Sequence, residues 1–343
     1  MTKKLFRQSF LLDSLDLSQE MPEGEEVVVA SGTRLKLHQR GVLEVIPAHL
    51  NDDSKHIVIS CGIHGDETAP MELLEKILVD IETGFQPVKE RLLLIVAHPE
   101  ATNAHQRFIE ANLNRLFDAK EHAPSKELEI ADMLKRRLTE FFLGTQPSKR
   151  WHFDLHSAIR DSRFYTFAVS PKSRHPVRSK ELMNFVQSAQ MEAILFSNAP
   201  SSTFSWYSGE QFAAQALTIE LGRVAKFGDN DLNKLVAFDL ALRDLIANSE
   251  PEHLPRKPLM YRVSRTIVRI HEDFDFLFDD DIANFTSFKH GEVFGHDGDK
   301  PLMAKNEGEA IVFPNRNVEI GQRAALMICP VQVRYEDGQI VYD

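Results

Sequence analysis

Cysteine, excess basic charge and long apolar runs are scarce in this sequence, and each scarcity excludes a class of protein. Only Cys61 and Cys329 are present. They lie far apart in apolar surroundings, so we expect buried free thiols in a reducing cytoplasm, with a single long-range disulfide as the alternative. The longest apolar run, LLLIVA, is far shorter than the roughly 20 residues of a membrane span. The N-terminal stretch also lacks the continuous apolar region of a secretory signal, so we predict a cytoplasmic protein.

The charge balance limits the kinds of partner. The 343 residues include 40 Lys and Arg against 51 Asp and Glu, which gives a formal net charge of −11 at pH 7. Nucleic acid or an anionic membrane would need a basic protein surface, so we expect neither as a partner. A small anion in a local basic pocket is compatible with this charge. The sequence leaves the oligomeric state open.

The hydrophobic pattern predicts an α/β fold between about residues 55 and 250, because short apolar runs alternate there with helical spacing. The expected strands have the sequences HIVIS, RLLLIVAH, WHFDLHS, RFYTFAV, AILFS and ALTIEL. Helices are expected near residues 71–83, 126–143, 178–190 and 230–249. Residues 98–114 are expected to form a polar loop, and such loops beyond strand ends often carry functional residues.

A change of composition marks a second domain. Three prolines in PEHLPRKP, residues 251–258, prevent a helix or a central strand there, so we interpret this segment as a linker. The sequences YRVSRTIVRI, GEVFGH, EAIVFP and RAALMICPVQVRY after it are typical of short strands. We therefore predict a first domain over residues 1–253 and a smaller β-rich domain over residues 254–343.

Four polar residues lie at or near the ends of three expected strands. His64 and Glu67 follow HIVIS, His156 ends WHFDLH, and Glu220 ends ALTIE. In open α/β sheets, ligands bind beyond the carboxyl ends of the strands, so these side chains can converge. Two imidazoles and a carboxylate leave one position of a tetrahedral zinc ion open, as in catalytic zinc sites. Such a set of side chains is therefore suited to one Zn²⁺ ion per subunit.

Each of these residues has an ordinary alternative explanation. A single H-x-x-E occurs by chance in many chains, His156 alone could be a hydrogen-bonded core histidine, and Glu220 alone could cap a helix. Together they are harder to explain in this way, because buried ionisable groups are costly without partners.

The chain resembles the zinc carboxypeptidase superfamily, and within it the succinylglutamate desuccinylase and aspartoacylase branch. The similar segments are GIHGDETAP, QRF followed by NLNRLF, RWHFDLHSAIR, STFSWYSGEQFAAQALTIELGRVAKFGDNDL and IVFPN. The resemblance extends over nearly the whole chain. It implies a mixed sheet flanked by helices, followed by a small all-β domain that narrows the mouth of the site.

The resemblance also implies roles for individual residues. His64, Glu67 and His156 match the zinc ligands, and Glu220 matches the glutamate that takes a proton from water and later delivers it to the departing amine. Arg107 matches the arginine that stabilises the carbonyl oxygen as it gains charge. The substrate carboxylate is expected to bind Asn114 and Arg115. Independently of the resemblance, Asp154 lies two residues before His156 and so on the same side of the strand. We expect it to be a hydrogen-bond partner of a ligand imidazole, with a bond to nearby backbone as the alternative.

The activity that the resemblance implies is zinc-dependent hydrolysis of N-succinyl-L-glutamate to succinate and L-glutamate, the last step of the arginine succinyltransferase route of arginine catabolism. The partner is then a small anionic N-acyl amino acid. One alternative is an aspartoacylase-like or other N-acyl-amino-acid amidohydrolase, and another is a non-catalytic metal-binding protein of the same fold. Four basic residues could bind the succinyl carboxylate, and the sequence does not choose among them: Arg160, Arg163, Arg223 and Lys226.

Overall fold

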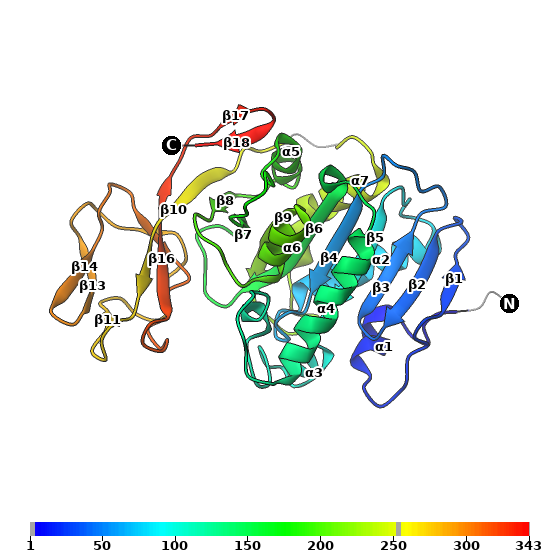
Figure 1. The fold of residues 1–343 in the computed structure, drawn as a ribbon, viewed down its shortest axis with the longest axis horizontal. Helices are drawn as coiled ribbons and strands as arrows, with labels where there is room; N and C mark the ends of the chain where they lie inside the picture. Colours follow the sequence, from blue (N-terminus) through cyan, green and yellow to red (C-terminus); the bar gives the residue numbers. More distant parts are fainter. Residues whose placement is uncertain (1–3, 252–254, 343) are drawn as a thin grey trace.

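A computed structural model describes residues 4–251 and 255–342. Its main feature is one 13-stranded mixed sheet that runs through both lobes of the molecule (Figure 1). From edge to edge the order is β1 (Glu26–Val28), β2 (Arg34–Gln39), β3 (Val42–Ile46), β5 (Arg91–Val96), β4 (His56–Cys61), β6 (Arg150–Ala158), β9 (Gln215–Arg223), β7 (Thr166–Ser170), β8 (Ala193–Phe196), β10 (Leu259–Val268), β16 (Arg323–Pro330), β15 (Ala310–Val312) and β12 (Thr286–Ser287).

The centre of the sheet is parallel. Strands β5, β4, β6 and β9 all run in one direction, while their outer neighbours β3 and β7 run antiparallel to them. The carboxyl ends of the four central strands therefore lie at one edge of the sheet, which we call the carboxyl edge. Their first residues lie at the opposite, amino edge. The register places His156 of β6 directly beside Glu220 of β9.

Helices cover both faces of the central sheet, and the strands are buried on both sides. On β4, Ile57 and Ile59 belong to the core under α2 (Ala69–Thr83), α5 (Lys180–Ser188) and α7 (Val236–Ala247), while Val58 belongs to the core under α4 (Lys126–Phe142) and α6 (Phe204–Phe212). This alternation follows from the two-residue period of a strand. Strands buried on both faces are near-continuous apolar runs in sequence, which is why they were recognisable.

The helix ends follow the expected local chemistry. The Ser125 side chain accepts a hydrogen bond from the Leu128 N–H at the start of α4, as an N-cap does. Gly84 ends α2 with a left-handed backbone, φ 84°. A short helix α1 (Phe10–Leu15) precedes the sheet. No helix in the described parts of the chain is long and apolar enough to cross a membrane.

The C-terminal lobe continues the sheet. Strand β10 pairs with β8 in parallel and with β16 antiparallel, so the sheet passes from one lobe into the other. A second sheet of β11 (Asp275–Phe276), β13 (Val293–Asp297) and β14 (Lys300–Met303) encloses a separate apolar core with it. The hairpin of β17 (Arg334–Glu336) and β18 (Gln339–Val341) then returns to the first lobe, where the Tyr342 ring stacks on Phe196.

The predicted fold class is confirmed: a mixed sheet flanked by helices, with a smaller C-terminal β domain. The predicted boundary between residues 253 and 254 lies outside the described residues, so the division into domains stays a prediction. Two local expectations differ from the structure. Residues 98–114 contain a short helix, α3 (Pro99–Asn103), instead of loop alone. The helix expected from residue 230 begins as a 3-10 turn at Leu232–Leu235 and becomes α-helical only at Val236.

Candidate active site

The turn between β4 and α2 carries the first two candidate ligands, and two glycines shape it. Gly62 has φ 68°, a left-handed conformation that glycine adopts without strain. A Cβ on Gly65 would lie 2.3 Å from the Ala101 carbonyl carbon, so only glycine lets the following loop pack this closely. The Gly65 N–H donates to the Arg107 carbonyl, 3.1 Å away. This close approach brings the 101–107 segment against His64 and Glu67.

The Glu67 carboxylate is the centre of the site and is 2% exposed. Its Oε1 lies 2.9 Å from His64 Nδ1 and its Oε2 lies 2.8 Å from His156 Nδ1. The Ser157 N–H also donates to Oε2, at 3.2 Å. Burial alone would raise the pKa of Glu67, but the two histidines hold it well below its usual value. Glu67 is therefore ionised, and its carboxylate attracts hydrogen-bond donors and cations.

The outer nitrogens of both imidazoles have fixed partners. His64 Nε2 lies 3.1 Å from Asn112 Oδ1, and that oxygen also accepts the backbone N–H of Asn114, which fixes the orientation of the Asn112 amide. His156 Nε2 lies 3.0 Å from Asp154 Oδ2. Both partners are acceptors, so in a neutral ring each Nε2 carries the proton and each Nδ1 presents a lone pair.

The donor set fits a divalent metal ion. Ligand atoms of His64, Glu67 and His156 all lie within 4.8 Å of one another, and all three residues are buried. The Nδ1 atoms of the two imidazoles face the two Glu67 oxygens at hydrogen-bond distance, where either protons or a metal ion can join the nitrogens to the carboxylate. Histidines bound to zinc donate their outer N–H to a carboxylate or carbonyl oxygen, as these two do to Asp154 and Asn112.

Glu220 faces the same site from β9 and is 8% exposed. Its Oε2 is buried and has no hydrogen-bond partner within residues 4–251 and 255–342. Burial raises the pKa of Glu220 to about 7, with His156 opposing this shift and Glu67 adding to it. Strands β6 and β9 continue to Ala158 and Arg223, so His156 and Glu220 lie inside their strands and not at the ends predicted from sequence.

Arg107, the second predicted catalytic residue, and the predicted substrate-binding residues border the same centre. Arg107 Nη1 donates to Glu67 Oε1 at 2.7 Å. Asn114 is buried, and its Oδ1 accepts the Phe204 N–H, so its amide nitrogen points toward His156, 3.4 Å from Nε2. Since Nε2 is itself a donor, the Asn114 NH₂ group remains available to another acceptor. Arg115 is solvent-exposed, and its side chain donates to the Asn114 carbonyl.

Positive charge gathers around Arg115. Although the Arg115 side chain reaches solvent, the protein packed around its guanidinium, together with Arg323 and Arg107, lowers its pKa to about 10. Its guanidinium forms no ion pair with a carboxylate in the described residues. Among the four basic residues considered for the succinyl group, Arg223 pairs with Asp161 at 2.9 Å. Burial lowers the pKa of Arg160, which lies close to Asp280 and Arg316.

Comparison with known proteins assigns the family. Residues 53–246 match the succinylglutamate desuccinylase/aspartoacylase catalytic domain, and residues 256–331 match the AstE/AspA barrel-sandwich hybrid domain. The chain belongs to the succinylglutamate desuccinylase/aspartoacylase family. It is therefore an enzyme, a hydrolase, as predicted from the resemblance. The second match coincides with the C-terminal β lobe.

Individual members of the succinylglutamate desuccinylase/aspartoacylase family align with the chain from end to end. A protein named succinylglutamate desuccinylase from Vibrio cholerae serotype O1 (strain M66-2) is 68% identical over 343 residues, the full length of both chains. A crystal structure of that enzyme from Vibrio cholerae has a TM-score of 0.98 and covers 99% of this chain and 100% of its own. The enzyme from Chromobacterium violaceum has a TM-score of 0.81 at 31% identity, over 94% of this chain and 98% of its own.

One residue of the candidate active site has no sequence signal of its own: Asn112 stands in NLNRLF, two residues before Asn114. Its amide orients His64, which only the three-dimensional arrangement reveals. The two histidines left outside the metal site, His98 and His105, have different settings: His98 is buried and bonded to Glu127, and His105 is exposed.

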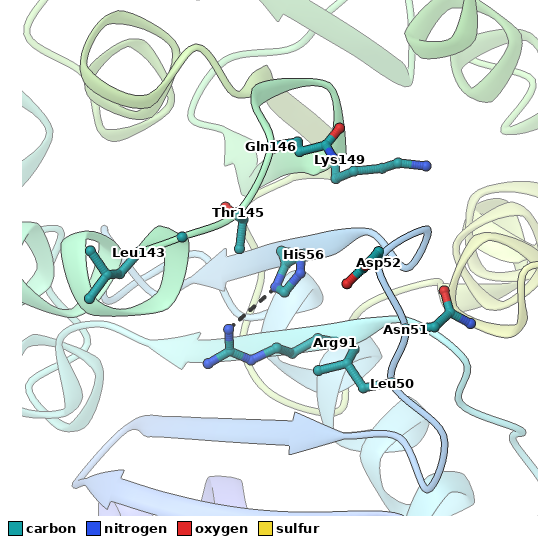
Figure 2. Close-up of a pocket in the computed structure, with 10 residues that line it drawn as sticks. Leu50, Asn51, Asp52, His56, Arg91, Leu143, Thr145, Gln146 and Lys149 are labelled. Atoms are coloured by element: carbon teal, nitrogen blue, oxygen red, sulfur yellow. Dashed lines mark hydrogen bonds between the residues drawn. The ribbon is translucent and has the colours of Figure 1, made fainter.

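A separate cavity lies at the amino edge, remote from the candidate active site. It has a volume of about 340 Å³ and is lined in part by His56 and Arg91, the first residues of β4 and β5. Figure 2 shows these two side chains in contact, with the 143–149 segment around them. His64 and Glu67 follow the other end of β4, so this cavity is not part of the candidate active site.

Proposed function

We propose that the protein hydrolyses N-succinyl-L-glutamate to succinate and L-glutamate with one zinc ion held by His64, Glu67 and His156. The observation that carries this proposal is the agreement of two independent facts. Relatives 65–68% identical over the full chain are named succinylglutamate desuccinylase. The side chains at the carboxyl edge form a donor set suited to a catalytic metal. The expected place of this reaction is the end of arginine catabolism, inside the cell.

The chemistry that zinc supplies when bound is Lewis acidity, which lowers the pKa of water to about 7 and polarises a carbonyl oxygen. The protein's own residues supply proton transfer. Glu220 is suited to this because its free Oε2 and its raised pKa let it gain and lose a proton near neutral pH. In our proposal it takes a proton from the attacking water and returns it to the amide nitrogen, so glutamate leaves as a neutral amine.

Substrate binding is assigned to the basic and amide groups beside the metal ligands. A guanidinium carries five N–H donors, and the bond to Glu67 uses only one donor of Arg107, so the others can face the carbonyl oxygen as it becomes negative. The NH₂ group of Asn114 and the guanidinium of Arg115, which has no carboxylate partner among the described residues, suit a substrate carboxylate. Local positive charge then compensates the −11 net charge of the chain.

A substrate panel tests this proposal. The purified protein, loaded with zinc, is assayed on N-succinyl-L-glutamate, N-acetyl-L-aspartate and a short peptide by measuring the free amine released. We expect the highest kcat/KM for succinylglutamate. Preference for acetylaspartate would favour the aspartoacylase-like alternative, and cleavage of the peptide alone would reject the proposed substrate.

A metal analysis separates the enzyme from a non-catalytic metal-binding protein. The same preparation is analysed for bound metals, then stripped with a chelator and reloaded with zinc. We expect hydrolysis to be lost on stripping and regained with zinc. Stoichiometric zinc without turnover on any of the three compounds would support the non-catalytic alternative.

A further inference from the structure

A row of buried polar side chains extends from His156 into the core, away from the metal ligands. Asp154 Oδ1 accepts from Ser60 Oγ at 2.7 Å, and the same hydroxyl lies 2.9 Å from His152 Nε2. His152 Nδ1 lies 2.8 Å from Ser208 Oγ. Ser60, His152, Asp154 and Ser208 are each 0% exposed. The row therefore joins β4, β6 and α6 to the site without contact with solvent.

The direction of each hydrogen bond follows from Asp154. A carboxylate only accepts, so the single proton of Ser60 points to Asp154 Oδ1. The Ser60 oxygen is then an acceptor for His152, whose proton must be on Nε2. In a neutral His152 ring, Nδ1 is left as an acceptor for the Ser208 hydroxyl, for which the Ser205 carbonyl competes at 2.9 Å. Burial lowers the pKa of His152 to about 4, so the ring is neutral.

The surroundings give no packing reason for these polar groups. His152 lies edge-on to Phe204, with ring centroids 4.6 Å apart, and the sheet register places Val58 of β4 and Ala216 of β9 beside it, all of them buried. A leucine of similar volume would fill such a position without burying polar atoms. Burial of polar atoms costs free energy unless each of them has a hydrogen-bond partner. What the polar side chains add is a fixed direction for the Asp154 carboxylate.

We propose that Ser60 and His152 are positioning residues: they hold the Asp154 carboxylate so that His156 keeps its proton on Nε2 and presents its Nδ1 lone pair to the metal. This inference rests on the proposed metal site. The chain runs Ser208 to His152 to Ser60 to Asp154, and Asp154 then receives the His156 N–H at 3.0 Å. Loss of Ser60 removes the donor to Asp154 Oδ1, and loss of His152 removes the donor that holds the Ser60 hydroxyl in place. In both cases the carboxylate can rotate and the imidazole loses its fixed orientation.

The test measures zinc affinity of the full chain by competition with a chelator, with zinc alone as the probe. The variants are S60A, H152L, H152Q and the double variant S60A/H152L. Glutamine can place its Nε2 donor near that of histidine, so H152Q retains the bond to Ser60. S173A is the matched control, because Ser173 is a buried serine that donates to the Gly209 carbonyl, outside this row. Thermal unfolding of each zinc-free variant reports the structural effect separately.

We expect S60A and H152L each to weaken zinc binding about tenfold, the lower end of the range for partners of metal-bound histidines. The double variant should bind zinc no more weakly than S60A, since both changes break the same row of hydrogen bonds. H152Q should recover most of the loss, and S173A should bind zinc like the unchanged protein. If H152L does not fold, the zinc affinities of S60A and H152Q still test the proposal.

Unchanged zinc affinity in folded S60A would overturn the proposal, as would independent, additive losses in the double variant. Zinc affinity does not depend on which amide is cleaved. A protein that binds zinc with the expected pattern but does not hydrolyse succinylglutamate would refute the proposed substrate and leave this inference standing. A protein that binds no zinc would refute the metal site itself.

Discussion

The amino and carboxyl edges of the central sheet hold the same kinds of buried polar residue, but they differ in how completely these residues are paired with one another. At the amino edge, Glu44 accepts from His38 at 2.6 Å and from Arg91 at 2.7 Å. Arg91 also donates to His56 and to the Phe141 carbonyl. Burial alone would raise the pKa of Glu44, but His38 and Arg91 lower it below its usual value. This cluster pairs its charges within itself.

At the carboxyl edge the pairing is incomplete. In the described residues Glu220 Oε2 has no hydrogen-bond partner and Arg115 has no carboxylate partner, while both His64 and His156 turn their Nδ1 atoms to the single carboxylate of Glu67. Buried histidine, arginine and glutamate therefore do not by themselves mark an active site. What distinguishes one is hydrogen-bonding capacity left for something outside the chain.

The largest contrast concerns turnover. We expect E220Q to lower kcat by about 10²–10⁴-fold, the usual contribution of general acid–base catalysis, while zinc content stays stoichiometric. The matching change at the amino edge, E44Q, should leave kcat within about twofold, since loss of one remote hydrogen bond does not change proton transfer. Steady-state kinetics of both variants check this. Equal kcat in E220Q and the unchanged protein would remove Glu220 from the mechanism.

The second contrast concerns metal. H156A removes a ligand, so zinc affinity should fall more than the roughly 10–100-fold that loss of an outer partner costs. H56A removes a histidine of the amino edge and should bind zinc normally. Metal analysis after dialysis against a weak chelator measures both. Full zinc occupancy in H156A would overturn the ligand assignment.

The third contrast has opposite signs at the two edges. The lowered pKa of Glu44 means that its ionisation stabilises the fold above about pH 4.5 and that this contribution is lost as pH falls below that value. E44Q should therefore lower the free energy of unfolding at pH 7 by about 1–3 kcal/mol. The pKa of Glu220 is raised from 4.5 to about 7, so its ionisation destabilises the zinc-free fold as pH rises through this range.

E220Q removes that penalty, so the zinc-free variant should be more stable than the unchanged protein above pH 7, by about 1–3 kcal/mol. Urea unfolding of both variants at pH 5 and pH 8, with a chelator present, measures the difference. If both variants lose stability alike at pH 8, the two carboxylates do not differ as the structure indicates.

The smallest effect is expected on the rim of the amino-edge cavity. Lys149 contacts Asp53 at 3.5 Å, and the Asp53 side chain is 97% exposed. Exposed pairs contribute little, so K149A should change stability by less than about 0.5 kcal/mol and should not alter kcat. Thermal unfolding and the standard assay are enough to check it. A marked loss of activity would show that the two edges communicate.

The part of the site that sequence predicts is the part governed by strand ends. His64, Glu67, His156 and Glu220 could be brought together because parallel strands place their carboxyl ends side by side. Asp154 could be added because it lies two residues from His156 on the same face of β6, and it does bond to that ring. The structure brings these residues together, although His156 and Glu220 lie inside β6 and β9 and not at the ends of these strands.

The contacts that depend on loop paths could not be predicted in the same way. The bond from Arg107 to Glu67 requires the 101–107 segment to pack on Gly65, a close approach that no sequence period encodes. Asn112 orients His64 only because a 3-10 turn at Leu113–Arg115 fixes its amide. The Glu44 cluster depends on β3 pairing with β5, and the N-terminal strands have no strong sequence signal.

The pairing of β8 with β10 bears on how this enzyme can be dissected. The match to the catalytic domain ends at residue 246, and the match to the hybrid domain begins at residue 256. A fragment that ends there would leave the β8 edge that pairs with β10 without a partner strand, and an unpaired edge promotes pairing with other chains. The fragment would also lose the stacking of the Tyr342 ring on Phe196. Expressed separately, the two pieces should aggregate or recombine, because one sheet continues from β8 into β10 across the border between the two family matches.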